Sequence, residues 1–316
     1  MKILLSLFFF SFSVIAQDVD AIYWNSLATD VTVGVPLADD NSLIGGRIQV
    51  KVSFDAGKSF KDMGEPSVIN KGDTDDIKLV SIASEIFEGM EGFNEGGNAQ
   101  FIATVWDRAG NNITGSVSDS MLTIDETLPI LIDLKNISSN ANKSLAMPED
   151  SITFQMSTNE SIKKPLFEIN GEIYENAVGA GKSWMFVYLA SDADDGPLKF
   201  IIDYTDLAGN PGSSISIATD SLIITMDGTA PKLTKVNLKT SNPYDQSLAV
   251  EGDTVFINFI ASEPIKDINA LLNNSESKLY KEENLDYIYF HIFTKSDSQG
   301  VIPFTLDYKD QAGNIG

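Results

Sequence analysis

Apolar and polar residues alternate with a period of two in several short stretches of the chain. Residues 48–54 read Ile-Gln-Val-Lys-Val-Ser-Phe, and residues 152–156 read Ile-Thr-Phe-Gln-Met. Successive side chains of a β-strand point to opposite faces, so this pattern predicts strands that are buried on one face only.

Short apolar runs bounded by Gly, Asp, Ser or Asn predict further strands. These runs cover residues 184–189, 198–204, 215–217, 288–293 and 302–308. Residues 82–87 are compatible with one helical turn. The pattern predicts an all-β protein.

Three motifs recur along the chain in the same order. Asp-x-Ala-Gly-Asn occurs at 107–111, 206–210 and 310–314. Asp-x-Thr-x-Pro occurs at 125–129 and 227–231, and Ser-Leu-Ala at 144–146 and 247–249. A common spacing of about 100 residues indicates repeated units, each the size of a small β-sandwich domain.

The two motifs Asp-x-Ala-Gly-Asn and Asp-x-Thr-x-Pro, in this order, resemble those of the bacterial immunoglobulin-like (Ig-like, Big-type) domains found in tandem in exported and cell-surface proteins. The resemblance implies three tandem Ig-like β-sandwiches in an extended array. We place a divergent first repeat at residues 17–125, a second at 126–227 and a third at 228–316.

Turn chemistry explains the residues of Asp-x-Ala-Gly-Asn. The Asp can bond its own backbone two residues on, and Gly can take a positive φ. We therefore expect a tight turn between the last two strands of each repeat. Tyr204 and Tyr308 precede this turn, where the first repeat has Val105, and we expect the rings to pack in the core.

The third repeat is expected to lack its last strand. Asn111 and Asn210 are followed by enough chain for a strand before Asp125 and Asp227, but only two residues follow Asn314. Either the sequence is truncated and further modules follow Gly316, or a strand from another chain completes the sandwich.

The first residues predict an export signal. Lys2 is followed by an almost wholly apolar stretch at residues 3–15, and Ala16 offers a small residue before Gln17. We interpret residues 1–16 as a cleaved signal peptide. The alternative is a membrane anchor, but the stretch is too short to cross about 30 Å of hydrocarbon, and no later stretch is apolar enough. We expect an extracellular or cell-surface protein.

Composition narrows the chemistry. The chain has 45 acidic and 22 basic residues, a net charge of −23, only two arginines and no cysteine. Nucleic-acid binding, disulfides and thiol catalysis are therefore disfavoured. His291 is the single imidazole; the repeats align it with Val187, and we expect a half-buried strand residue. No phosphate-binding loop occurs, and we predict a protein that is not an enzyme.

Calcium is the cofactor that the acidic turns suggest, because Ca²⁺ prefers carboxylate and carbonyl oxygens. Sandwich topology should gather acids of one repeat with the turn of the next. The candidate ligands are Asp125, Glu126, Asp206, Asn210, Asp192, Asp194, Asp195, Asp227 and Asp310. The alternative is a set of solvated acidic loops that keep the protein soluble.

Two functions fit these features. The first is an adhesive or spacer stalk, rigidified by calcium, whose partner is a surface glycan or a protein. The second is the N-terminal accessory region of a longer secreted hydrolase or carbohydrate-binding protein. Tyr23, Trp24 and Trp184 could stack on sugars, although the position of Trp184 in an apolar strand favours core packing.

Overall fold

The computed structural model describes residues 22–118, 120–191 and 195–316. The chain divides into two compact units. One ends at Ile130 and adds the segments Asn159–Lys163 and Tyr204–Ser213; the other comprises Leu131–Thr158, Lys164–Asp203 and Ser214–Gly316. The predicted export signal, Asp192 and Asp194 lie outside the described residues.

The first repeat forms two sheets. Its elements are β1 (Ile22–Trp24), β2 (Asp30–Pro36), a 3₁₀ turn (Asn41–Leu43), β3 (Arg47–Ser53), β4 (Lys61–Asp62), β5 (Ser67–Val68), β6 (Ile77–Ala83), α1 (Ser84–Glu88), β7 (Asn98–Trp106), β8 (Asn112–Thr114) and β9 (Leu122–Ile124). One sheet has the order β1-β9-β7-β3-β4, with β5 on β3 and β8 on β7; the other pairs β2 with β6.

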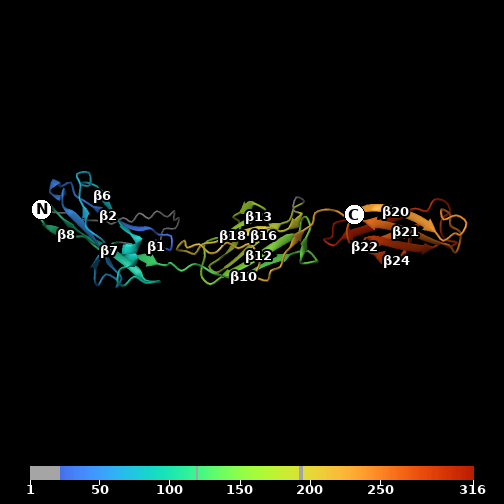
Figure 1. Cartoon of the computed structure of the whole chain (residues 1–316), viewed down its shortest axis with the longest axis horizontal. Coiled ribbons are helices and arrows are strands. Elements are labelled where there is room, and N and C mark those ends of the chain that lie inside the picture. The colour runs from blue at the N-terminus through green and yellow to red at the C-terminus, as the bar shows by residue number, and fades with distance from the viewer. Residues whose placement is uncertain (1–21, 119, 192–194) are drawn as a thin grey trace. The chain divides into compact units, whose positions relative to one another are not determined.

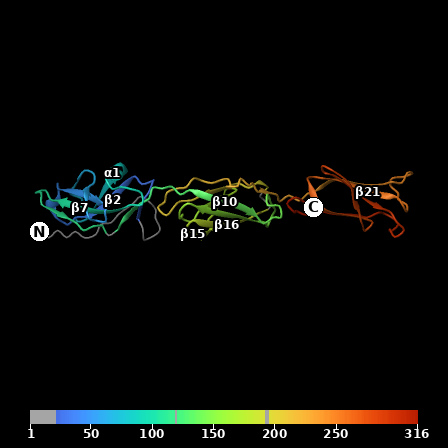
Figure 2. The same ribbon diagram turned by 90° about the horizontal axis from the view of Figure 1, so that it is seen from below.

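The second repeat is built from three small sheets. Its strands are β10 (Leu131–Ser138), β11 (Leu145–Ala146), β12 (Ser151–Thr158), β13 (Leu166–Ile169), β14 (Glu172–Tyr174), β15 (Val178–Ala180), β16 (Ser183–Leu189), β17 (Gly196–Pro197), β18 (Phe200–Asp203) and β19 (Thr225–Met226). The sheets are β10-β12-β16-β15, β14-β13-β18 and β11-β19-β17. Figures 1 and 2 label β10 and β16 in the first of these sheets, where β12 lies between them.

The third repeat keeps two of these sheets. Its strands are β20 (Leu233–Thr240), β21 (Thr254–Ala261), β22 (Ile265–Leu272), β23 (Ser275–Glu276), β24 (Lys278–Glu283), β25 (Asp286–Ile292) and β26 (Phe304–Asp310). The orders β20-β21-β25-β24 and β23-β22-β26 match the first two sheets of the second repeat. Among the described residues, no strand of the third repeat corresponds to β19.

Each of two hydrophobic cores stays within one repeat. The buried cluster of the first repeat runs from Trp24 to Ile124, and that of the third from Val255 to Tyr308. In the second repeat, the rings of Phe154, Phe167 and Phe186 contact one another between the sheets. The predicted all-β architecture of tandem Ig-like sandwiches is confirmed, while the residues chosen as domain boundaries stay predictions.

Strict alternation is wrong for β3. Ile48, Val50 and Val52 are buried as expected, but Gln49 is buried too. Its Nε2 donates to the carbonyl oxygens of Val50, Met63 and Gly64 at 2.9–3.2 Å. A buried amide is tolerated because its donors are satisfied.

Two other local expectations also need correction. Ile215 makes a single bridge to Ile202 in place of the strand expected at 215–217. His291 pairs with Val255, as Tyr188 pairs with Ile152, so its counterpart in the second repeat is Tyr188 and not Val187. The helical turn near residues 82–87 exists as α1 and begins at Ser84, after β6 has ended.

The residue two positions after the turn motif packs against the residue two positions before it. Tyr204 is buried, and a Cβ added to Gly212 would lie 2.2 Å from its ring. Gly316 lies under Tyr308 in the same way, at 2.0 Å. In the first repeat Val105 pairs with Ile113 at the corresponding place. A large ring thus faces glycine, and a smaller residue faces isoleucine.

We expect Gly212→Ala to destabilise the protein by about 1–3 kcal/mol, because the new methyl group must displace a buried ring. Adding Tyr204→Val should recover part of this loss by making room. Urea unfolding of the single and double variants measures the coupling. Gly72→Ala is the control, since no atom lies within 4 Å of its Cβ position. Equal effects at Gly72 and Gly212 would contradict the packing argument.

Candidate metal centres

The repeated turn is held by a clamp between its Asp and its Asn. Asp206 Oδ1 accepts the backbone N–H groups of Gly209 and Asn210 at 2.6 and 2.8 Å, and its Oδ2 accepts Asn210 Nδ2 at 2.7 Å. Asp310 makes the same three bonds, at 2.6, 2.9 and 2.8 Å. The Asp therefore bonds backbone three and four residues on, and not two as expected. Both carboxylates are buried.

The clamp also reaches the end of the preceding repeat. Asn210 Nδ2 donates to the carbonyl oxygen of Asp125 at 2.8 Å, and Asn314 Nδ2 donates to that of Asp227 at 2.8 Å. An amide nitrogen carries two hydrogens, so it serves both acceptors. In the first repeat Asp107 and Asn111 form the clamp at 2.7 Å, with Asn111 exposed.

In the second and third repeats, an asparagine of the preceding repeat also donates a hydrogen bond to the turn. Asn25 Nδ2 donates to the carbonyl oxygen of Ala208 at 2.8 Å, and Asn140 Nδ2 donates to that of Ala312 at 2.7 Å. Around the second turn, Ser26 N–H also donates to Asn210 Oδ1 at 2.7 Å. These bonds determine where the carboxylates beside the turn lie.

Two groups of three carboxylates result. The first carboxylate trio is Asp125, Glu160 and Asp206, and the second carboxylate trio is Asp227, Glu263 and Asp310. In each trio, one oxygen per residue lies within 4.8 Å of the others. Each trio lies inside one of the two compact units. Each combines the last Asp of one repeat with a Glu and an Asp of the next.

Like charges perturb the acids of both trios. Burial, followed by the charges of Asp206, Glu95 and Glu160, raises the pKa of Asp125 to about 6. Burial and the Asp310 charge raise the pKa of Asp227. Burial raises the pKa of Glu263 as well, with the charges of Asp227 and Asp310 adding to it. Without a counter-ion, the carboxylates of each trio repel one another.

Neighbouring acids hold the segment after each terminal Asp. Glu95 accepts the backbone N–H of Glu126 at 2.9 Å and the Thr127 hydroxyl at 2.7 Å. Asp195 accepts the corresponding groups of Gly228 and Thr229, both at 2.7 Å. The Thr229 hydroxyl bond, followed by the Gly228 bond, lowers the pKa of Asp195.

The predicted ligands thus have different positions. The structure brings Asp125 together with Asp206, and Asp227 with Asp310, whereas Asp195 is engaged by Gly228 and Thr229. Among the remaining candidates, Glu126 accepts the Trp24 indole N–H at 3.1 Å, and Asn210 belongs to the clamp. Asp192 and Asp194 lie outside the described residues. Whether the trios bind a cation stays a prediction.

Sequence reasoning missed Glu160 and Glu263 as candidate ligands. They occur in the matching segments Glu160-Ser-Ile-Lys and Glu263-Pro-Ile-Lys. Each lies two residues after its strand, β12 or β21, and precedes β13 or β22, the strand that pairs with the one leading into the turn. A glutamate that recurs with the turn motif was the available signal.

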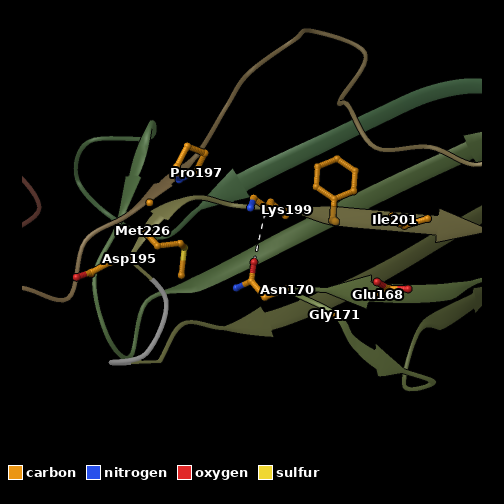
Figure 3. A pocket seen from close by; sticks show the side chains of 10 residues that line it. Glu168, Asn170, Gly171, Asp195, Pro197, Lys199, Ile201 and Met226 are labelled. Carbon is orange, nitrogen blue, oxygen red and sulfur yellow. Dashed lines mark hydrogen bonds between the residues drawn. The ribbon is translucent and has the colours of Figure 1, made fainter.

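A pocket beside two strands of the second repeat lacks the usual nucleophile–base pairs of hydrolases. It has a volume of about 410 Å³ and lies beside β17 and β18, where Lys199 N–H donates to Asn170 Oδ1 at 3.4 Å (Figure 3). No Ser, Thr, His or Cys lines it. His291 lies elsewhere, with Nε2 at 3.1 Å from both carboxylate oxygens of Asp297.

Several solved structures align with the chain at low sequence identity and low TM-score. No protein-family model and no curated protein sequence matches it. One structure comes from a study of the host cell surface retention of a 1.5-MDa bacterial ice-binding adhesin. Its alignment covers 98% of this chain and 95% of the adhesin chain, at 16% identity and a TM-score of 0.43. Fibronectin(III)-like modules of Clostridium thermocellum CbhA align with 70% of this chain and 95% of their own, at 12% identity and a TM-score of 0.38. The I9–I11 tandem of titin covers 98% of this chain and 97% of its own, at 13% identity and a TM-score of 0.27. Similarity at this level does not transfer a function.

The raised pKa of Asp125 predicts a stability difference that depends on pH. Between its ordinary pKa of about 4 and its folded pKa of about 6, the folded state binds more protons than the unfolded state, so stability falls as pH rises. In EDTA, Asp125→Asn should therefore be more stable than the parent at pH 7, by about 1 kcal/mol after solvent screening. Urea unfolding should show this advantage shrinking toward pH 4. An advantage that is the same at both pH values would contradict the repulsion.

Proposed function

We propose that this is an exported, non-enzymatic protein of tandem Ig-like sandwiches that acts as a spacer or adhesive stalk, with Ca²⁺ bound by the two carboxylate trios. One observation carries the proposal: both trios have the same residue types, in the same order, on the same Asp–Asn clamp. Acids that serve only to keep the surface soluble would not need to recur together with the Asp–Asn clamp that positions them.

The dimensions of the trios suit calcium. Ca²⁺ binds six to eight oxygens at about 2.3–2.6 Å, so two oxygens on opposite sides of the ion lie about 5 Å apart. The oxygens of each trio lie within 4.8 Å of one another. Three carboxylates also supply more negative charge than one Ca²⁺ carries, and backbone carbonyls and water can complete the shell. An ion would convert the repulsion that raises the pKa of Asp125 into attraction.

Bound calcium would have a mechanical effect. Asp125 and Asp227 end their repeats, and each is followed four residues later by a proline that restricts the chain. An ion held by such an Asp together with two acids of the next repeat would limit bending at that position. A stalk that presents a binding partner away from a surface benefits from this restraint.

Several features support a role without catalysis. The imidazole of His291 contacts Asp297, and no Ser, Thr, His or Cys lines the pocket beside β17 and β18. Trp24 is buried, which removes it as a platform for sugars, and Trp184 is half-buried with its indole N–H on the Gly181 carbonyl. A glycan or a protein of a cell surface remains the partner class that we propose.

We also propose export, supported by the apolar stretch at residues 3–15. No helix among the described residues is long and apolar enough to cross a bilayer. Expression in a bacterial host should give mature protein outside the cytoplasm that begins at Gln17, as measured by mass spectrometry. Protein that keeps residues 1–16 and stays in the cytoplasm would contradict export.

Calcium should raise the melting temperature of the full chain. At a concentration 100-fold above its Kd, a ligand contributes about 2.7 kcal/mol, which corresponds to roughly 10–20 °C for a domain of about 100 residues. Trp24 reports on the first carboxylate trio, because its indole bonds to Glu126, the residue after Asp125. Melting followed by calorimetry and by tryptophan fluorescence, in calcium and in EDTA, measures both effects.

Matched variants separate the two trios. Glu160→Gln should reduce the calcium response of the tryptophan signal strongly, because it removes a ligand of the trio beside Trp24, and Glu263→Gln should reduce that signal less while reducing the calorimetric gain. Glu65→Gln, at an exposed site outside the trios, is the control. Melting and X-ray scattering that are unchanged by EDTA would refute the calcium proposal.

A further inference from the structure

One sheet of the third repeat carries aromatic side chains on its outer face. The sheet has the order β20-β21-β25-β24. Val255, Ile257 and Phe259 of β21 are buried in the core, so the residues between them point to the opposite face. Phe256 is one of these, and it pairs with Phe290 of β25. Neither ring is fully buried. Two phenylalanine rings therefore lie side by side on the solvent side of the sheet.

A third ring from β24 joins them. The register of β24 shifts between Leu279 and Lys281, and Tyr280 lies at this irregularity with 64% of its surface exposed. Its ring centroid lies 5.4 Å from that of Phe256 and 6.2 Å from that of Phe290, at angles of 72° and 83°. The two phenylalanine rings are inclined by only 40°. We call Phe256, Tyr280 and Phe290 the aromatic platform.

The platform belongs to a straight row across all four strands. Lys239 of β20 pairs with Phe256, Phe256 with Phe290, and Phe290 with Lys278 of β24. Neighbouring strands lie about 4.8 Å apart, so the row spans about 14 Å. A lysine therefore stands at each end of the row, with the aromatic rings between them.

The charge of this face is opposite to that of the whole chain, which has a net charge of −23. By strand pairing, four lysines and two acids point outward, a net charge of +2: Lys235, Lys239, Lys278, Lys281, Glu283 and Asp286. Glu283 forms an ion pair with Lys281, and Asp286 accepts a hydrogen bond from Asn258. Within the described part of the chain, Lys235, Lys239 and Lys278 have no ion pair.

The second repeat shows that the fold does not require these residues. The row that corresponds to Lys239, Phe256 and Phe290 consists of Ile137, Thr153 and Val187. The outward charges on β10 are Asp133 and Lys135, which pair with each other at 3.4 Å. The same face of the same sheet thus has neither aromatic rings nor an excess of positive charge.

We propose that the outer face of β20, β21, β25 and β24 binds an acidic polysaccharide whose sugar rings carry carboxylates. The apolar face of a sugar ring packs against the aromatic platform, and carboxylates on either side accept hydrogen bonds from Lys239 and Lys278. This inference rests on the adhesive role proposed above and names the partner of that role.

Charge and ring geometry together select this partner. A neutral glycan would leave the lysines at both ends of the row without a counter-charge, and an acidic protein loop would leave the aromatic platform uncovered. The negative charge of the rest of the chain does not prevent binding. At physiological salt, exposed charges farther away than about 8 Å are largely screened, so the lysines beside the platform dominate.

The test uses the full chain and fluorescently labelled oligosaccharides of galacturonate, mannuronate and guluronate. Anisotropy is measured in EDTA, so that calcium bound by the sugars or by the carboxylate trios has no effect. At least one oligosaccharide should bind saturably, and its methyl ester, which lacks the charge, should bind about tenfold more weakly. Polyglutamate of equal charge should also bind about tenfold more weakly, because it offers no sugar ring. Binding of none of the sugars, or equal binding of the ester or of polyglutamate, would overturn the proposal.

Variants that introduce the residues of the second repeat locate the site. Phe256→Thr and Phe290→Val should each weaken binding about tenfold, while melting shows that the chain still folds. Lys239→Gln combined with Lys278→Gln should weaken binding and reduce its dependence on salt. Lys135→Gln, on the matching face of the second repeat, is the control and should bind like the parent. Binding by the ring and lysine variants that equals that of the parent would place the site elsewhere.

Two further measurements distinguish the alternatives. Sedimentation velocity of the parent without sugar should show no self-association; self-association that Phe256→Thr abolishes would identify a second copy as the occupant and contradict the polysaccharide. Calcium titration of the same protein tests the trios separately, because none of the residues of this face belongs to a trio. Loss of sugar binding with calcium binding intact would refute this partner alone, whereas sugar binding without calcium binding would refute only the calcium part of the proposed function.

Discussion

The clamp between Asp206 and Asn210, repeated by Asp310 and Asn314, is the interaction on which the candidate site depends. A buried carboxylate loses several kcal/mol of hydration, and the three hydrogen bonds that it accepts offset this cost. Because the Asp accepts one amide hydrogen of Asn, the other is available to the carbonyl oxygen of Asp125. One turn therefore closes a hairpin and fastens the last residue of the preceding repeat.

The motif recurs in all three repeats, although only the two later copies have both roles. The clamp of the first repeat, between Asp107 and Asn111, has the internal bonds, and its Asn is exposed. In the two later repeats the Asn is joined to Asp125 or Asp227. The same five residues thus stabilise a turn in every repeat, and acquire their carboxylate neighbours only where another repeat precedes them.

The sequence predicted the parts of this arrangement that local chemistry determines. Glycine at positive φ and the repeated Asp and Asn identified the turn. Sandwich topology predicted that Asp125 lies close to Asp206 in space. It did not predict the roles of Glu160 and Asp195, because these depend on which loop side chain reaches which backbone group. The burial of Gln49 was missed for a similar reason, since its acceptors come from a segment more than ten residues away as well as from its neighbour.

The central claim is that each carboxylate trio binds one calcium ion. Isothermal titration of calcium into the metal-free full chain at pH 7 tests it most directly, because the number of ions bound per chain is obtained without assuming any structural effect. The account predicts two ions for the parent, one for a chain carrying Glu160→Gln or Glu263→Gln, and none for the chain carrying both. Binding of two ions by the double variant, or of none by the parent, would contradict it.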